Sequence, residues 1–205
     1  MGRNGAGKST TMKAIMGLVE RLGRILFNGE DITRLKPYEI ARRGLGFTPE
    51  DRRIFSDLTV MENLDVGRQP SRRFADGSPA PAFTPEDLFA LFPNLAEMPD
   101  RLGSRMSGGE QQMLTVARTL MGNPFLLLLD EPSEGVSPLI VEQMATTILE
   151  LKSKGLSILL SEQNIHFARL VSDRVYVLEK GQLRWEGTLD ALDQSEDVQR
   201  TYLTV

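Results

Sequence analysis

The chain has 205 residues, 40% of them hydrophobic and 25% charged, which suits a globular protein with one sizeable core or a core with a modest subdomain. The formal net charge of −4 provides no basic surface for nucleic acid or an anionic membrane. No apolar run approaches the roughly 20 residues that span a bilayer. The absence of cysteine excludes disulfides and thiolate metal sites.

In the first half of the chain, hydrophobic periodicity predicts short strands separated by helices. The spacing of Met12, Ile15, Met16 and Val19 predicts a helix from about residue 8 to residue 17. Proline-rich residues 68–84 have little periodicity, so we expect a surface loop there within a helical subdomain. The other elements expected in this half are strands at 24–27 and 45–47 and helices at 37–43, 59–66 and 85–92.

The second half alternates between helices and strands more regularly. We expect helices at 109–121, 138–154 and 165–171, strands at 125–129 and 156–160, a hairpin of 174–178 with 182–186, and two short closing helices. Strands that alternate with helices predict an α/β fold with a mostly parallel sheet covered by helices on both faces.

Residues 2–9 match the phosphate-binding pattern G-x-x-x-x-G-K-[ST] at every fixed position. Glycines let the backbone N–H groups turn inward around a phosphate, Lys8 can reach the outer phosphates, and the Ser9 hydroxyl can bind Mg²⁺. The residues expected to bind ATP are Gly2, Arg3, Asn4, Gly5, Ala6, Gly7, Lys8, Ser9 and Thr10.

Four leucines precede Asp130 and Glu131, which places this acidic pair at the carboxyl end of a buried strand. Asp130 can hold Mg²⁺, and Glu131 can polarise a water molecule in line with the γ-phosphate. The alternative is that the pair only caps the next element, but a complete phosphate loop upstream favours the chemical role.

A second anion site is predicted where residues 106–112 (M-S-G-G-E-Q-Q) begin an amphipathic helix. Ser107, Gly108 and Gly109 offer a hydroxyl and accessible N–H groups at its N-terminus. One nucleotide does not need two such loops, whereas in a head-to-tail dimer each chain's second loop closes over the γ-phosphate held by the other chain. The plainer alternative is a serine N-cap followed by glycines.

Together these motifs resemble the ATP-binding subunits of ABC transporters over essentially the whole chain. The resemblance implies Walker A at residues 2–9, a signature loop at 106–110 that includes Glu110, and Walker B at 126–131 with Glu131 as the catalytic glutamate. It also implies ATP and Mg²⁺ as cofactors. Residues 42–55, 106–113, 161–164 and 198–203 are similar to the Liv-type ATPase, one of two non-identical ATPases in importers of branched-chain amino acids.

Three positions depart from the general ABC pattern and resemble the Liv-type branch. Glu50 replaces the glutamine of the Mg²⁺-sensing loop and is still an oxygen donor for the metal. Gln163 takes the catalytic position of the switch histidine, where it can hydrogen-bond the γ-phosphate but cannot accept a proton. Ser137 occupies the usual aspartate position. His166 is expected to be a surface or helix-packing residue rather than a displaced switch.

The resemblance also predicts the domain organisation. We expect residues 1–205 to form one ABC ATPase domain, with a RecA-like core at 1–49 and 122–205 and a helical subdomain at 50–121. ABC ATPases normally carry N-terminal strands before Walker A, so we expect the N-terminal β subdomain to be largely missing from the chain as written.

These features predict an ATP-hydrolysing subunit of an importer, most simply for branched-chain amino acids, driven by ATP-dependent dimer closure. Its expected partners are a sister ATPase (the same or a different chain), two permease subunits and, indirectly, a solute-binding protein, without nucleic acid. It would lie on the cytoplasmic face of the inner membrane, held by the permease. Alternatives are the ATPase of a urea or amide importer, a non-transport ABC ATPase, and an inactive truncated product.

Overall fold

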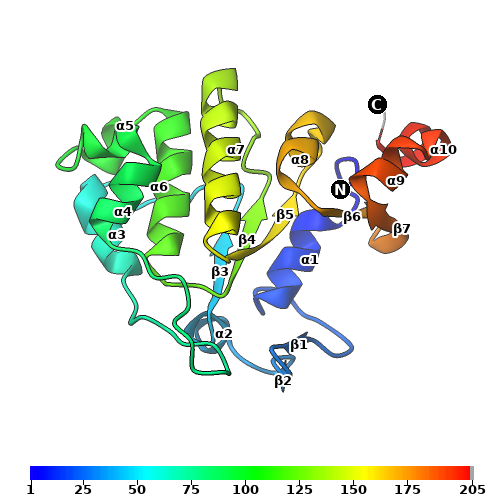
Figure 1. Ribbon diagram of the computed structural model, residues 1–205, viewed down its shortest axis with the longest axis horizontal. Helices are drawn as coiled ribbons and strands as arrows, with labels where there is room; N and C mark the ends of the chain where they lie inside the picture. Colours follow the sequence, from blue (N-terminus) through cyan, green and yellow to red (C-terminus); the bar gives the residue numbers. More distant parts are fainter. Residues whose placement is uncertain (204–205) are drawn as a thin grey trace. The chain divides into compact units, whose positions relative to one another are not determined.

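The computed structural model describes residues 1–203, and their contacts divide into two compact units. The first unit joins Met1–Arg43 to the chain from Leu160 onward, and the second is Gly44–Leu159. Helices and short strands alternate along the chain, as expected from the sequence (Figure 1). The division into a core and a helical subdomain at residues 50 and 121 stays a prediction.

In the first unit, β6 and β7 form an antiparallel hairpin that turns at Lys180 and Gly181, both with positive φ. Val175 and Val177 of β6 pack with Leu192 into a small core. The helices and strands of this unit are α1 (Lys8–Ile15), β1 (Leu26–Phe27), β2 (Glu30–Asp31), α2 (Pro37–Arg42), α8 (Ile165–Val171), β6 (Arg174–Glu179), β7 (Gln182–Thr188), α9 (Leu189–Asp193), α10 (Glu196–Val198) and η2 (Gln199–Leu203).

The second unit contains β3 and β4, which pair in parallel with Leu45 opposite Leu126 and Thr48 opposite Leu129. Strand β5 lies on the other side of β4. Three leucines of β4, residues 127–129, are completely buried, as expected for a central strand. The elements here are β3 (Leu45–Thr48), α3 (Val60–Gly67), α4 (Pro85–Leu91), α5 (Pro93–Ala96), η1 (Gly103–Arg105), α6 (Gly108–Leu120), β4 (Leu126–Asp130), α7 (Pro138–Ser153) and β5 (Ser157–Ser161), the last ending just past the boundary of the unit.

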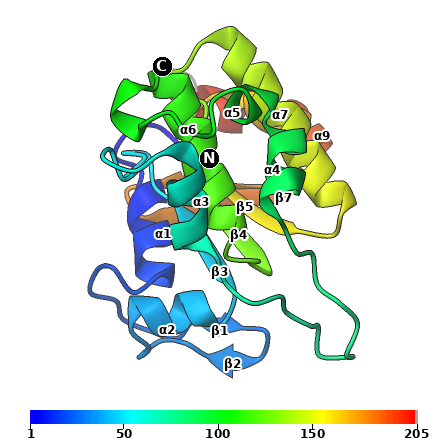
Figure 2. The same cartoon turned by 90° about the vertical axis from the view of Figure 1, so that its left-hand side faces the viewer.

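The segment between α3 and α4 is a long loop, as the sequence predicted (Figure 2). Asn123 holds both of its ends. Its amide nitrogen donates to the Gln69 carbonyl (2.8 Å) and its amide oxygen accepts from the Phe83 N–H (2.9 Å). Arg72 adds a hydrogen bond from Nε to the Asn123 carbonyl (2.8 Å), and burial lowers the pKa of the Arg72 guanidinium.

Among residues 1–203, no helix combines the length and apolarity needed to cross a membrane.

Asn63 of α3 provides a test of how the second unit is held together. It is fully buried, and its carboxamide bonds both the N–H (2.9 Å) and the carbonyl (3.0 Å) of Phe55 and the carbonyl of Thr59 (2.9 Å). We expect Asn63→Ala to lower the free energy of unfolding by about 2–3 kcal/mol, because buried polar groups lose their partners. Urea unfolding monitored by circular dichroism measures this.

The matched control is Asn94→Ala, which removes a single hydrogen bond to Gln143 (3.3 Å) from a half-buried position. Its cost should stay below about 1 kcal/mol. If the two variants lowered the free energy of unfolding equally, the buried hydrogen bonds of Asn63 would stabilise the protein no more than the single hydrogen bond of Asn94.

Candidate active site

The Walker A residues form a turn that leads directly into α1. The Ala6 N–H bonds the Arg3 carbonyl (3.1 Å), and the N-cap residue Gly7 is left-handed (φ 99°). At Gly2 (φ 151°), an added Cβ would lie 2.4 Å from the Leu178 carbonyl oxygen of β6, so no side chain fits without a backbone shift. The loop therefore passes against β6 and presents the N-terminus of α1, an arrangement that suits a phosphate.

Lys8 lies inside this loop and is 6% exposed. Its ammonium donates to the carbonyls of Gly2 (2.8 Å) and Arg3 (3.1 Å). The next two residues, Ser9 and Thr10, are half-buried and exposed, respectively. The predicted phosphate-binding residues are thus contiguous on one loop and one helix turn, with a cation at their centre.

The segment after β5 brings Gln163 to the same loop. The amide nitrogen of Gln163 donates to the side-chain oxygen of Asn4 (2.7 Å). Just before it, the carboxylate of Glu162, only 2% exposed, accepts the N–H groups of Gln163 and Asn164 (both 3.1 Å). His166 is exposed on α8, as expected for a surface residue. The sequence motifs predict Gln163 and Asn4 as site residues independently of each other. Only the folded structure shows that their side chains are hydrogen-bonded.

Asp130 and Glu131 stand at the carboxyl end of β4, where the sequence predicted them. They are 1% and 7% exposed. The backbone of Glu131 is left-handed (φ 48°), a conformation that is unfavourable for residues other than glycine. Residues in such strained conformations are most frequent at functional sites. The backbone thus leaves the extended conformation of β4 at Glu131, directly after Asp130.

Glu50 follows β3 by two residues and is exposed. Strands β3 and β4 are parallel, with Thr48 opposite Leu129. Glu50 and the Asp130–Glu131 pair therefore lie at the same, carboxyl-terminal end of the two strands. The second unit therefore gathers three carboxylates of the predicted site at one end of its strands.

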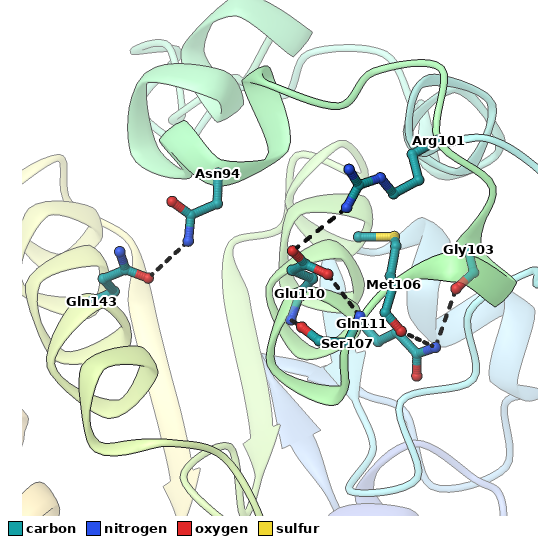
Figure 3. Close-up of polar contacts among 8 residues, drawn as sticks. All are labelled: Asn94, Arg101, Gly103, Met106, Ser107, Glu110, Gln111 and Gln143. Atoms are coloured by element: carbon teal, nitrogen blue, oxygen red, sulfur yellow. Dashed lines mark hydrogen bonds and ion pairs between the residues drawn. The ribbon is translucent and has the colours of Figure 1, made fainter.

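The signature loop is built around a capping box (Figure 3). The Glu110 carboxylate accepts the Ser107 N–H (2.6 Å), and the Ser107 hydroxyl accepts the Glu110 N–H (3.3 Å). Nη1 of Arg101 lies 3.9 Å from Oε1 of Glu110, which makes an ion pair. The side-chain amide nitrogen of Gln111 donates to the carbonyls of Gly103 (3.1 Å) and Met106 (3.3 Å). The charge of Glu110 is thereby engaged within the loop, while Ser107 stays exposed with a hydroxyl hydrogen to donate.

The sequence profile described as "ABC transporter" matches residues 1–134. The chain belongs to the ABC transporter family. The high-affinity branched-chain amino acid transport ATP-binding protein BraG of Pseudomonas aeruginosa is 40% identical over 204 residues, covering 99% of this chain and 85% of BraG. The lipopolysaccharide export system ATP-binding protein LptB of Haemophilus influenzae is 36% identical over 212 residues, covering 99% of this chain and 83% of LptB.

Solved ABC cassettes share the fold of this ABC ATPase, which confirms the expected α/β architecture. A nucleotide-free ATP-binding cassette superimposes with a TM-score of 0.76 at 28% identity, over 96% of this chain and 82% of that one. A cassette in its ADP conformation gives a TM-score of 0.77 at 28% identity, over 98% and 83%.

Arg52 is a feature of this ABC ATPase that the sequence did not indicate. Its backbone is left-handed (φ 61°), its carbonyl accepts the Thr115 hydroxyl (2.9 Å), and its buried Nε has no hydrogen-bond partner among the described residues. The guanidinium lies against the signature loop, because a Cβ added to Gly108 would be 2.9 Å from Nη1. On the other side of the loop, a Cβ on Gly109 would be 2.8 Å from Ile140 of α7. Neither glycine has room for a side chain unless its neighbour moves.

The predicted metal donors suit Mg²⁺ by their chemistry. Ser9 offers a hydroxyl at the start of α1, Asp130 a buried carboxylate at the end of β4, and Glu50 an exposed carboxylate after β3. Mg²⁺ prefers such hard oxygen ligands and keeps several waters and phosphate oxygens of its own. Within residues 1–203, no group of three or more histidine, aspartate or glutamate side chains is close enough to hold a metal unaided. In each unit the predicted donors are therefore hard oxygens, the type of ligand that Mg²⁺ prefers.

Proposed function

We propose that this chain is the ATP-hydrolysing subunit of an importer of branched-chain amino acids. The observation that carries the proposal is the 40% identity to BraG, which extends over 99% of the chain. A probable branched-chain amino acid transport ATP-binding protein LivF of Archaeoglobus fulgidus, 35% identical over 202 residues, supports it. So do Glu50, Gln163 and Ser137, the three departures that resemble the Liv-type branch.

In this proposal each site residue has a defined chemical task. Lys8 and the N–H groups of the Walker A loop bind the phosphates, with the dipole of α1 adding attraction for negative charge. Glu131 draws a proton from the attacking water, whose oxygen forms a bond to the γ-phosphorus as the bond to ADP breaks. Gln163 donates an N–H to the γ-phosphate. Held by Ser9, Asp130 and Glu50, Mg²⁺ would neutralise charge on the phosphates.

The signature loop implies a partner subunit. Ser107, Gly108 and Gly109 would close over the γ-phosphate held by a sister ATPase, and that subunit's signature loop would close over this chain's nucleotide. Closure and hydrolysis would move two permease subunits in the membrane, with a solute-binding protein delivering the amino acid. The chain would lie on the cytoplasmic face of the inner membrane, attached through the permease.

The second candidate is lipopolysaccharide export. LptB of Escherichia coli is 34% identical over 212 residues, close to the values for the amino-acid transport proteins. The two functions share the same hydrolytic site and differ in the membrane subunits that the ATPase energises. An ATPase of a urea or amide importer would differ from that of a branched-chain amino acid importer only in the solute that the whole transporter carries.

Reconstitution tests the solute directly. The chain is purified with the permease, the sister ATPase and the binding protein of its own operon and placed in proteoliposomes. We expect leucine-loaded binding protein to raise ATP hydrolysis severalfold and radiolabelled leucine to enter the vesicles. Lys8→Ala in the same complex should abolish both signals. Stimulation by urea or an amide alone, or ATP-driven lipopolysaccharide extraction, would select one of the other transporters.

A further inference from the structure

The hydrogen bond between Gln163 and Asn4 joins two segments that are 159 residues apart in the sequence. At 2.7 Å between the amide nitrogen and the amide oxygen, it is a close side-chain contact within the first unit. It links the residue at the switch position to the Walker A loop, so it connects two parts of the proposed catalytic site directly.

The backbone on the Gln163 side is already fixed. The buried Glu162 carboxylate binds two successive N–H groups, those of Gln163 and Asn164. Asn164 then caps α8, accepting the Phe167 N–H (3.0 Å). These contacts hold the backbone, whereas the carboxamide of Gln163 lies at the end of a side chain with several rotatable bonds. The hydrogen bond to Asn4 is made by this carboxamide, so it acts on the part of Gln163 that would reach a phosphate.

The Asn4 side is fixed as well. Asn4 lies within the turn closed by the Ala6 N–H and the Arg3 carbonyl (3.1 Å). The Lys8 ammonium holds the carbonyls of Gly2 and Arg3. The backbone that carries Asn4 is therefore held by contacts of the neighbouring residues.

We propose that Asn4 is a positioning residue for Gln163, and this inference rests on the proposed function. An amide nitrogen carries two hydrogens, so Gln163 can give one to Asn4 and the other to a γ-phosphate oxygen. A glutamine cannot use charge to draw itself toward the phosphate, so its orientation has to be provided by a neighbour. Asn4 provides it from the loop that binds the phosphates.

A double-mutant cycle tests the coupling. The assembled ATPase is prepared as wild type, Asn4→Ala, Gln163→Ala and the double variant, and kcat and KM for ATP are measured. We expect each single change to lower kcat about tenfold. The double variant should be within about twofold of the worse single variant, because the second change removes an interaction already lost. Losses that multiply would overturn the proposal.

A conservative variant separates positioning from simple damage to the loop. Asn4→Asp keeps an acceptor oxygen for Gln163 but places a negative charge beside the phosphates. Its kcat should stay within about threefold of wild type while KM rises, because the added charge weakens binding of the ground state and of the transition state about equally. Equal losses of kcat for Asn4→Asp and Asn4→Ala would overturn the proposal.

Gln194→Ala is the matched control, since it removes an exposed amide at the end of α9 and should leave both constants unchanged. The outcomes also distinguish this inference from the proposed function. If the wild-type assembly hydrolyses ATP and the losses multiply, only the role of Asn4 is wrong. If the wild-type assembly does not hydrolyse ATP, the proposed function fails and this inference fails with it.

Discussion

Replacing Glu131 with glutamine is expected to reduce ATP hydrolysis by at least about 100-fold, or ~2.7 kcal/mol of barrier. Glutamine has the same shape and fits the same buried position, but it cannot accept a proton from the attacking water. Binding of ATP should change by less than about twofold, or ~0.4 kcal/mol. Single-turnover phosphate release measures the first effect. Size-exclusion chromatography with the sister ATPase should show an ATP-bound dimer that persists.

Two matched variants support the interpretation of Glu131→Gln. Glu134→Gln makes the same change three residues away, at an exposed carboxylate, and should leave turnover unchanged. Lys8→Ala should instead weaken nucleotide binding itself, because the ammonium at the centre of the loop is lost. A loss of less than about tenfold for Glu131→Gln, roughly 1.4 kcal/mol, would exclude this residue as the base.

Long elements could be predicted because their sequence patterns repeat over several turns. The helices α6 and α7 begin and end within one residue of the predicted positions. Helix α3, predicted at 59–66, begins with a capping box of Thr59 and Glu62, a pattern of neighbouring residues that the local sequence carries. Strand β4 is displaced by one residue from its prediction. Phe125 lies outside it because the Phe125 N–H bonds the Gly44 carbonyl and the ring packs against Phe74.

The strand predicted at 24–27 contains β1, whereas the short elements β2 and α5 were not predicted, because periodicity does not decide the structure there. The two-residue strands β1 and β2 pair across Asn28 and Gly29, both with positive φ. Asn-Gly is the usual sequence of such a two-residue hairpin turn, so a signal for β2 was present. The four-residue helix α5 is too short for any periodic pattern.

The features of the candidate site also fall into two groups, those that the sequence predicts and those that only the structure reveals. Walker A, the signature loop and Walker B could be identified because each function depends on neighbouring residues in a fixed order. Arg52 against Gly108, and Gln163 on Asn4, could not, because each contact joins residues far apart in the sequence. Glu110 shows a further limit. The sequence placed it in the signature loop but did not indicate that its carboxylate would be occupied by the Ser107 N–H.

Ser107→Arg is expected to separate what the chain does to its own nucleotide from what it does to its partner's. Ser107 is exposed at the N-cap of α6, so arginine can be accommodated there, but it would obstruct an opposing subunit. ATP hydrolysis by the assembled dimer should fall about 100-fold. The isolated chain should bind ATP within about twofold of wild type, or ~0.4 kcal/mol.

Two controls separate obstruction from loss of the cap. Ser107→Ala removes the hydroxyl at a cost of roughly 1 kcal/mol of helix stability and adds no bulk. It should therefore still form the dimer, with reduced turnover. Ser104→Arg places the same side chain at an exposed position three residues earlier and should leave hydrolysis unchanged. If Ser107→Arg weakens ATP binding by the isolated chain as strongly as it weakens hydrolysis by the dimer, the signature loop acts on the chain's own nucleotide. The head-to-tail arrangement would then be wrong.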